Sequence, residues 1–431
     1  MILRDPVHGL IAFESDDESI IERLLATREV QRLRRIRQLG FTSLAYPGAE
    51  HTRFAHAVGT AHVMKRLAYR LRDIHEALPF WHRLSSQQTR DALAAALLHD
   101  IGHGPASHMF ESALPLSVPH EVWTDRIVLD SSSDVHRVLA SEDPDMPARV
   151  ARLIAGQHEL PYLARAVAGT FDVDRCDYLL RDAHATGVRY GNFDLEWFHR
   201  SLRFAPLAAD GSPPPLAIDG AKGLAAIESF VLARLFMFQQ VYFHKATRSA
   251  EWMARMALSR ALHCMRDSVR LPNTPAAFVA AAEGREPTLG EYLELDDGVL
   301  MGTLHAWESS RDDVLASICK RLRARELFKS IELVGEAQCE PKARARAWEI
   351  ARDISREAGL DPDTHVGLDI ATDTPFDDSK DTLVVVYSQG AARKPGDVSF
   401  LLGRLNGESL TRVRLIVPGE IRDRIQQAIG A

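Results

Sequence analysis

Residues 92–108 read Ala-Leu-Ala-Ala-Ala-Leu-Leu-His-Asp-Ile-Gly-His-Gly-Pro-Ala-Ser-His, and they decide how the chain is interpreted. The first part of this stretch is apolar without interruption, which is typical of a buried helix. The apolar run ends in the adjacent pair His99 and Asp100. An imidazole and a carboxylate without partners would cost several kcal/mol at the end of a buried helix. A metal ion bound by both groups would remove that cost.

Histidines crowd around this stretch. Half of the chain's 18 histidines lie between His51 and His120, a window of about a sixth of the sequence. Histidine is the commonest metal ligand and carries protons near neutral pH. Imidazoles and carboxylates together suit Mn, Fe, Co, Ni or Zn, and they leave coordination positions for water and a substrate oxygen. The candidate metal ligands are His56, His99, Asp100 and Asp174.

The composition is that of an ordinary globular protein, with 431 residues, 46% hydrophobic and 26% charged. A net charge of −7 disfavours a protein that binds nucleic acid over its whole surface, although a local basic cleft stays open. Unbroken apolar runs such as Leu93 to Leu98 are too short to cross a bilayer, and no secretory signal is visible. Four scattered cysteines without CxxC spacing fit reduced thiols. We therefore expect a cytoplasmic protein with no membrane partner.

The pattern of apolar residues predicts a mainly α fold. Apolar spacing of three and four residues covers most of the chain from Ile20 to about Leu322. A Gly and Pro-rich turn within Leu202 to Ile218 predicts a small hairpin inserted between helices. After a charged helix, strand-like runs follow at Val366 to Ile370, Leu383 to Tyr387 and Val413 to Val417. We expect a helical domain over residues 1–340 and a small α+β lobe over residues 341–431.

Residues Arg28 to Gln38 are predicted to form a helix that carries five arginines. One interpretation is a solvated face whose apolar side packs on the core. The other is a contact to phosphate or to a second subunit, because the arginine fork matches phosphate oxygens.

The order of these motifs resembles the HD superfamily of metal-dependent phosphohydrolases. The resemblance is to the branch that holds the deoxynucleoside triphosphate triphosphohydrolases, among them the vertebrate enzyme that joins an HD domain to a sterile alpha motif. It implies an HD-type helical bundle. Beyond residues 99–108, the segments with counterparts in that branch are Asp5-Pro-Val-His-Gly9, Gln31-Arg-Leu-Arg34, Gln38-Leu-Gly40, Tyr46-Pro-Gly48, His51-Thr-Arg-Phe-Ala-His56, Asp174-Arg-Cys-Asp-Tyr178, Arg181-Asp182 and Tyr242-Phe-His-Lys245.

The resemblance assigns roles at the reaction centre. It makes His56, His99, Asp100 and Asp174 the metal ligands, and it places His103, His108 and His120 along the phosphates. His108 would transfer the proton, since a pKa near neutral lets an imidazole act as acid or base. Glu111, one helical turn later, would orient His108. The vertebrate relative has Asp at that position.

The resemblance also implies a substrate pocket and an effector site. Phe238 replaces a histidine of the vertebrate relative in that pocket. At the effector site, Gln31 and Arg34 are kept, whereas Ala26 and Trp197 replace charged residues, which argues against strict activation by guanine nucleotides. The implied pocket residues are Arg53, Arg234 and Lys245 for the triphosphate, Gln38, Tyr178 and Asp182 for the sugar, and Tyr242 for the base.

These residues predict hydrolysis of deoxynucleoside triphosphates to deoxynucleoside and inorganic triphosphate. A transition metal would be the cofactor, with Mg²⁺ accompanying the nucleotide, and a homodimer or homotetramer is expected from the resemblance. Three alternatives stay open: an HD phosphohydrolase acting on another phosphoester, as nuclease, nucleotidase or cyclic-dinucleotide phosphodiesterase; a nucleotide-responsive regulatory module with a vestigial site; and a nucleic-acid-binding protein that uses the arginine-rich helix.

Overall fold

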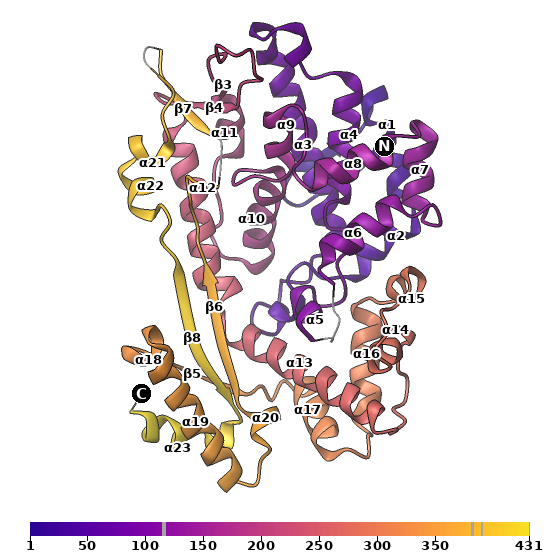
Figure 1. Cartoon of the computed structure of the whole chain (residues 1–431), viewed down its shortest axis with the longest axis vertical. Coiled ribbons are helices and arrows are strands. Elements are labelled where there is room, and N and C mark those ends of the chain that lie inside the picture. Colours follow the sequence, from indigo (N-terminus) through magenta and orange to yellow (C-terminus); the bar gives the residue numbers. More distant parts are fainter. Residues whose placement is uncertain (114–117, 381–382, 389–390, 431) are drawn as a thin grey trace.

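The computed structural model describes residues 1–113, 118–380, 383–388 and 391–430. Helices dominate these residues, and the sheets are small (Figure 1). The prediction of a mainly α fold with a small hairpin and a C-terminal α+β lobe is confirmed.

A first hydrophobic core holds the N-terminal body together. The helices of this body are α1 (Ser19–Leu25), α2 (Arg28–Arg32), α3 (Arg53–Ile74), α4 (Ser86–Leu98), α6 (His120–Leu129), α7 (Asp134–Glu142), α8 (Met146–Ile154), α9 (Pro161–Val167), α10 (Val173–Thr186), α11 (Leu195–Ser201) and α12 (Leu224–Met237), which a π-helical turn at Phe238–Tyr242 continues. At its centre, α3 packs against both α4 and α10. The apolar end of α4 is buried, as its composition predicts.

Side-chain caps fix where the central helices begin. Thr52 accepts a hydrogen bond from the backbone of Ala55 at the start of α3, and Asp172 accepts one from Arg175 at the start of α10. Helix α10 ends at Gly187, whose φ of 78° lies in the left-handed region that glycine adopts freely. The first turns of α3 and α10 therefore meet at the C-terminal end of α4, where the apolar run stops.

A second core surrounds the long helix α13 (Lys245–Arg266). Its other helices are α5 (His108–Ala113), α14 (Ala276–Ala282), α15 (Leu289–Leu293), α16 (Asp297–Trp307) and α17 (Asp313–Arg323). Helix α5 packs on α13. The residues that follow His99 thus connect the first core to the second.

The C-terminal lobe is built on one antiparallel sheet. Its strands are β5 (Lys329–Glu332), β6 (Gly367–Asp373) and β8 (Leu410–Val417), in the order β5-β8-β6, and its helices are α18 (Glu336–Cys339), α19 (Pro341–Glu357), α20 (Pro362–His365) and α23 (Gly419–Ile429). Strand β5 precedes residue 341, so the sheet draws on both sides of the predicted domain boundary.

Part of the C-terminal segment leaves this lobe. The chain crosses to the first core, in which Phe376 and Leu402 are buried. This segment also forms the short helices α21 (Pro395–Val398) and α22 (Phe400–Leu405). There β7 (Val384–Val386) pairs in parallel with β4 (Leu216–Asp219), which pairs antiparallel with β3 (Leu202–Phe204). The predicted insertion is therefore a three-stranded sheet, because burial of the apolar residues around β7 draws it to the first core (Figure 1).

A second hairpin was not predicted from the sequence. It consists of β1 (Ile2–Asp5) and β2 (Gly9–Ala12), which pair antiparallel at the N-terminus. Its strands are short and partly exposed, so they give little alternation for sequence analysis to detect.

One helical stretch among the described residues, Leu224–Tyr242, is long and apolar enough to cross a bilayer by length and composition. Core helices of soluble proteins pass the same test. Phe230, Val231 and Met237 of this stretch are fully buried in the first core.

The predicted arginine-rich helix ends early, because α2 stops at Arg32 and a 3₁₀ turn follows. All five arginines have partners within the chain, which favours a packed and paired face. The contacts are Arg28 with Glu29 (3.0 Å), Arg32 with the Leu295 carbonyl (2.8 Å), Arg34 with Gln31 (2.8 Å), Arg35 with Asp296 (2.5 Å) and Arg37 with Glu50 (2.5 Å).

Candidate metal centre and active site

Three of the four predicted metal ligands form a tight cluster. Nε2 of His56, on α3, lies 3.0 Å from Asp174 Oδ1, on α10. Nε2 of His99, which directly follows α4, lies 3.3 Å from that oxygen and 3.3 Å from His56 Nε2. The three ligand atoms lie within 4.8 Å of one another, so one ion could contact all of them.

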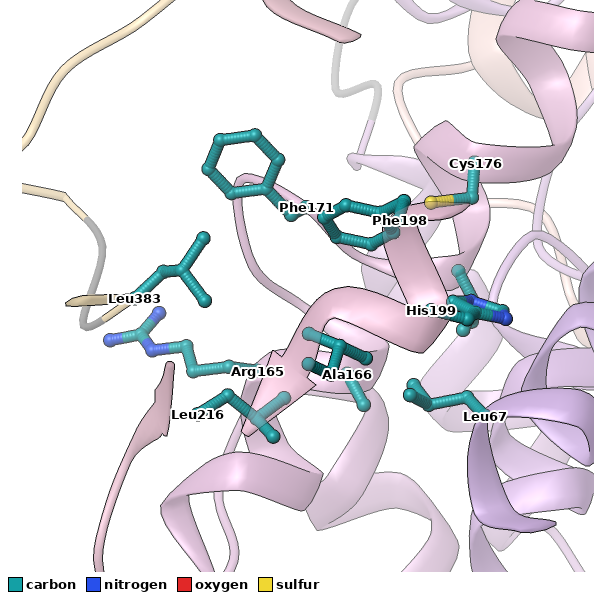
Figure 2. Close-up of a pocket in the computed structure, with 11 residues that line it drawn as sticks. Leu67, Arg165, Ala166, Phe171, Cys176, Phe198, His199, Leu216 and Leu383 are labelled. Atoms are coloured by element: carbon teal, nitrogen blue, oxygen red, sulfur yellow. The ribbon is translucent and has the colours of Figure 1, made fainter. Parts of the chain in front are cut away.

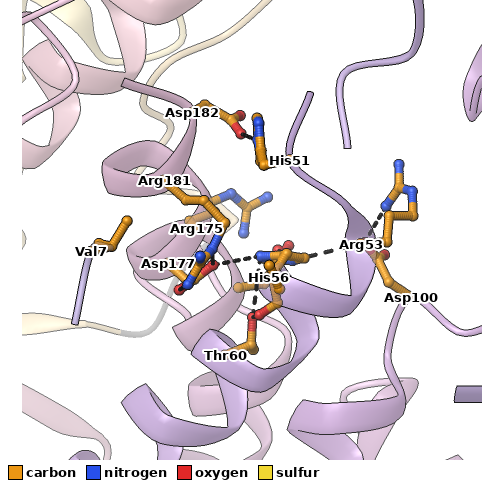
Figure 3. A network of polar contacts seen from close by, with 12 residues as sticks. Val7, His51, Arg53, His56, Thr60, Asp100, Arg175, Asp177, Arg181 and Asp182 are labelled. Atoms are coloured by element: carbon orange, nitrogen blue, oxygen red, sulfur yellow. Dashed lines mark hydrogen bonds and ion pairs between the residues drawn. The ribbon is translucent and has the colours of Figure 1, made fainter. Parts of the chain in front are cut away.

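The fourth predicted ligand lies beside this cluster. Oδ1 of Asp100 lies 3.6 Å from His99 Nε2, and Oδ2 lies 3.8 Å from His56 Nε2. Oδ2 also forms a buried ion pair with Arg53 (Figure 3). Burial opposes ionisation of this carboxylate, but Arg53 and the adjacent histidines hold the pKa of Asp100 well below its usual range. The group therefore offers a charged oxygen to a cation.

The surroundings of the cluster favour positive charge at its centre. Burial disfavours the charged form of His56, yet hydrogen bonds to Asp174 and Asp177 raise the pKa of this imidazole to about 10. A divalent ion bound by neutral imidazoles would supply that positive charge. The donor set, with two imidazole nitrogens and two carboxylates, therefore fits a transition metal.

A second layer of residues fixes the orientation of His56. Its Nδ1 lies 2.8 Å from Asp177 Oδ2, so Nε2 faces the cluster. Asp177 accepts two hydrogen bonds from Arg181 (2.8 and 2.9 Å; Figure 3). Asp177 also contacts His8 (2.7 Å), and Arg181 donates a hydrogen bond to Asp5 (2.7 Å). The N-terminal hairpin thereby reaches the metal centre.

Sequence analysis missed these supporting roles. Asp5, His8, Asp177 and Arg181 all lie in segments that carry the family resemblance, but their functions were not assigned. The spacing of Asp174, Asp177 and Arg181 by three and four residues was a usable signal, because such positions share one helix face.

Three of the four residues predicted to line the phosphates or transfer the proton lie beside the cluster, namely His103, Glu111 and His120. His103 and His120 stack with ring centroids 3.6 Å apart, and His103 Nε2 lies 3.3 Å from Asp100. Glu111 contacts His120 Nδ1 at 2.9 Å and His103 Nδ1 at 3.7 Å. Burial and the nearby Arg53 charge hold the pKa of His103 well below its usual range. The side chain of His108 lies outside the described residues.

Asp174 connects the cluster to a cavity of about 810 Å³, which is large enough for a nucleotide. Asp100, His103, His120 and Asp174 line one part of it, and five predicted pocket residues also line it. Asp182 is held there by His51 (2.7 Å) and by the hydroxyl of Tyr242 (2.8 Å). The predicted residues on this wall are Gln38, Arg53, Tyr178, Asp182 and Tyr242, together with Phe238.

Two predicted phosphate ligands do not line this cavity. Arg234 bonds Asp373 of β6 at 2.7 Å, and Lys245 is exposed at the start of α13. Arg175, which sequence analysis did not select, lines the cavity. It forms an ion pair with Asp172, the residue that caps the start of α10 (2.5 Å). Arg175 directly follows the predicted metal ligand Asp174, and this position could have identified it from the sequence.

The predicted effector residues lie on the surface beside α3. Arg34 is exposed, donates a hydrogen bond to Gln31 (2.8 Å) and stacks on the ring of Phe54 with its guanidinium 3.5 Å from the ring centroid. Neither effector residue lines the cavity described above.

A second cavity, shown in Figure 2, is a gap in the first core. It measures about 30 Å³ and is lined mainly by apolar side chains such as Phe171, Phe198 and Leu383. Burial lowers the pKa of His199, its one histidine, to about 3, so that imidazole stays neutral. The gap has room for a water but not for a nucleotide.

Two family models match the chain. The HD domain model matches residues 53–182, which include all four predicted metal ligands, and the model of an HD-associated region matches residues 215–272 and 275–431. The chain belongs to the HD family. The family is one of phosphohydrolases whose HD domains bind divalent metals, which supports a hydrolase, and the chain has His and Asp groups that could hold such a metal.

Relatives are similar to the chain over much of its length. YwfO of Bacillus subtilis, an uncharacterized protein, is 32% identical over 97% of this chain and 92% of its own length. The deoxynucleoside triphosphate triphosphohydrolase SAMHD1 is 31% identical in Danio rerio, over 84% of this chain, and 27% identical in Bos taurus, over 78%. The chain spans only 58% and 59% of those two enzymes.

Solved structures share the fold. A phosphohydrolase from Bacteroides thetaiotaomicron matches 97% of this chain and 99% of its own with a TM-score of 0.80 at 27% identity. A hypothetical protein from Aquifex aeolicus matches 99% of both chains with a TM-score of 0.73 at 24% identity, which concerns the fold alone.

Proposed function

We propose that the protein hydrolyses deoxynucleoside triphosphates to deoxynucleoside and inorganic triphosphate. One observation carries the proposal: Asp174 of the His56, His99 and Asp174 cluster, together with the adjacent Asp100, lines the same cavity as Arg53 and Tyr178. A metal, a cation for phosphate and an aromatic wall for a sugar thus meet in one space. SAMHD1, a relative over most of this chain, carries this activity in its name.

His56, His99, Asp100 and Asp174 would hold the metal, which we propose to be Mn, Fe, Co, Ni or Zn. Such an ion polarises a phosphoryl oxygen and lowers the pKa of a bound water. Mg²⁺ would accompany the nucleotide. Asp100 would turn from its pair with Arg53 toward the ion, which frees the guanidinium for the substrate.

Cations of the chain would bind the triphosphate. Arg53 already lies on the cavity wall, anchored by Ser107 Oγ at 2.7 Å, and Arg175 lies on the same wall. Arg234 and Lys245 complete the predicted set, and both would have to turn toward the substrate from their present positions. The arginine forks suit phosphate oxygens because they bind two oxygens at once.

The reaction breaks the bond between O5′ and the α-phosphorus. Water oxygen bonds to phosphorus and gives up a proton to the surrounding solvent, and the departing O5′ takes up a proton. We assign that proton to His108, with Glu111 orienting it and with His103 and His120 along the phosphates. Transfer from an imidazole of near-neutral pKa suits this step.

Sugar recognition would rest on Asp182, Gln38 and Tyr178 of the cavity wall. Asp182 is fixed by His51 and Tyr242, which leaves its carboxylate as a rigid acceptor for a sugar hydroxyl. Gln38 Oε1 is buried and has no hydrogen-bond partner in the described part of the chain. Tyr178 would close against C2′ and disfavour a ribose hydroxyl, and Tyr242 would stack on the base.

The test is to incubate the manganese- or iron-loaded protein with each deoxynucleoside triphosphate, singly and mixed, in ¹⁸O-labelled water. Deoxynucleoside and ¹⁸O-labelled triphosphate are expected. Monophosphate with pyrophosphate, or hydrolysis only of diesters or monophosphates, would move the assignment to another phosphoester. Absence of any product with the metal bound would favour a regulatory module.

Two further properties complete the proposal. Activity that appears only in nucleotide mixtures would support an effector at Gln31 and Arg34. A homodimer or homotetramer in the cytoplasm is proposed as the working form, and light scattering of the purified protein would measure the assembly.

A further inference from the structure

The cavity extends beyond the predicted nucleotide residues, along helix α13. Thr247, Glu251 and Arg255 line this part, and their spacing of four residues puts them on one helix face over about 12 Å. Asp369, on β6, forms the facing wall. The C-terminal lobe therefore contributes directly to the cavity.

Several polar atoms on this wall have no hydrogen-bond partner among the described residues. Oδ2 of Asp369 makes no hydrogen bond with any described residue, and Arg414 Nη1 lies 4.0 Å away. Oγ1 of Thr247 is likewise buried and unpaired among the described residues. Arg255 makes no hydrogen bond or ion pair in the described ranges. Burying unpaired polar groups costs free energy, so such groups on a cavity wall indicate a ligand that pairs with them.

The charges of this part of the cavity cancel. Arg248 donates to Asp369 (2.6 Å) and to Glu251 (2.8 Å), and Arg255 adds the second positive charge. A phosphate would need a surplus of cations, which this wall lacks. Hydrogen-bond donors and acceptors lie here beside the aromatic rings of Phe243 and Trp252. They suit a flat, uncharged group that has both donors and acceptors along its edge, such as a nucleobase.

We propose that this wall reads the base of the nucleotide and selects guanine. Arg255 donates to guanine O6 and N7, the pair of acceptors that an arginine fork matches. Asp369 Oδ2 accepts from the N2 amino group. Adenine would direct an amino donor at Arg255, and pyrimidines lack the O6 and N7 pair. The assignment rests on the proposed function, because it takes a nucleotide as the ligand of this cavity.

The experiment measures equilibrium binding of dGTP, dITP, 7-deaza-dGTP, dATP, dCTP and dTTP to the metal-loaded full chain, with hydrolysis followed in the same samples. dITP lacks the N2 amino group, and 7-deaza-dGTP lacks N7. We expect dGTP to bind about 5- to 100-fold more tightly than either analogue and than the other three nucleotides. Equal binding of all six, or a preference for dCTP, would overturn the proposal.

Two variants separate the contacts. Asp369→Asn should abolish the difference between dGTP and dITP, and Arg255→Met should abolish the difference between dGTP and 7-deaza-dGTP. Arg255 has no partner among the described residues, so its loss should not disturb folding, whereas Asp369→Asn needs a melting control. Arg266→Met, an exposed change on the same helix, should alter neither ratio. Variants that keep both ratios would contradict the assignment.

The outcomes separate this inference from the proposed function. Guanine-selective binding without release of triphosphate would retain the base-reading wall and refute the triphosphohydrolase. If all four deoxynucleotides bind with equal affinity and release triphosphate, the triphosphohydrolase is retained and the base-reading wall is refuted.

Discussion

His56 Nδ1 lies 2.8 Å from Asp177 Oδ2, in the core between α3 and α10. Both side chains are fully buried. A methyl group on Gly59, one turn after His56, would clash with Asp177 and with Arg181, so the close approach of the two helices depends on this glycine. The metal-facing nitrogen of His56 is therefore aimed by packing as well as by hydrogen bonding.

Asp177→Asn should weaken metal binding about 10- to 100-fold, because it removes the charged acceptor that orients His56. Elemental analysis and competition with a chelator would measure this. Asp423→Asn, an exposed change on α23, is the control and should bind metal like the wild type. Unchanged metal affinity in Asp177→Asn would show that the contact plays no part in holding the ion.

Arg181→Met should destabilise the fold by about 3–5 kcal/mol, since it leaves Asp177 and Asp5 as buried carboxylates without their cation. Urea unfolding of the metal-free protein would measure the change. Arg200→Met breaks an exposed pair with Glu196 and should cost under about 1 kcal/mol. Equal effects of the two substitutions would argue that the buried network adds nothing to stability.

The convergence of the candidate metal ligands could be predicted from the sequence, whereas the contacts that support them could not. His56, His99, Asp100 and Asp174 converge as expected because each stands at a helix end that capping and apolar periodicity locate. The contacts of Asp177 with His8 depend on pairing across 169 positions, which no local pattern contains.

The helices of the fold could be predicted from the sequence, whereas the pairing of distant strands could not. The buried half of α4 follows from composition alone. The transfer of β7 to the first core does not, because a strand-like run does not reveal which sheet accepts it. The contact of Arg234 could not be predicted for a similar reason, because its partner Asp373 lies 139 positions away, in the other lobe.

Stability should also depend on pH through Glu18. Burial opposes its charge, but hydrogen bonds from Tyr69 and Lys65 and from backbone amides lower the pKa of Glu18 to about 2. A depressed pKa stabilises the fold above the unfolded value near 4.5 and loses that contribution as pH falls toward 2. The stability difference between wild type and Glu18→Gln should therefore shrink over this interval. Glu22→Gln, at an exposed position of α1, should show no such trend. A stability difference for Glu18→Gln that does not change with pH would contradict the link between ionisation of Glu18 and stability.

His108→Ala and Asp100→Ala should separate proton transfer from metal binding. The first removes the proposed proton donor, so turnover should fall by a factor on the order of 100 to 10,000 while metal content stays intact. The second removes a proposed metal ligand and leaves Arg53 without its carboxylate, so metal content itself should fall. Turnover and metal stoichiometry, measured on the same preparations, distinguish the two. Full turnover in His108→Ala would transfer the proton step to His103 or His120, and stoichiometric metal in Asp100→Ala would remove Asp100 from the ligand set.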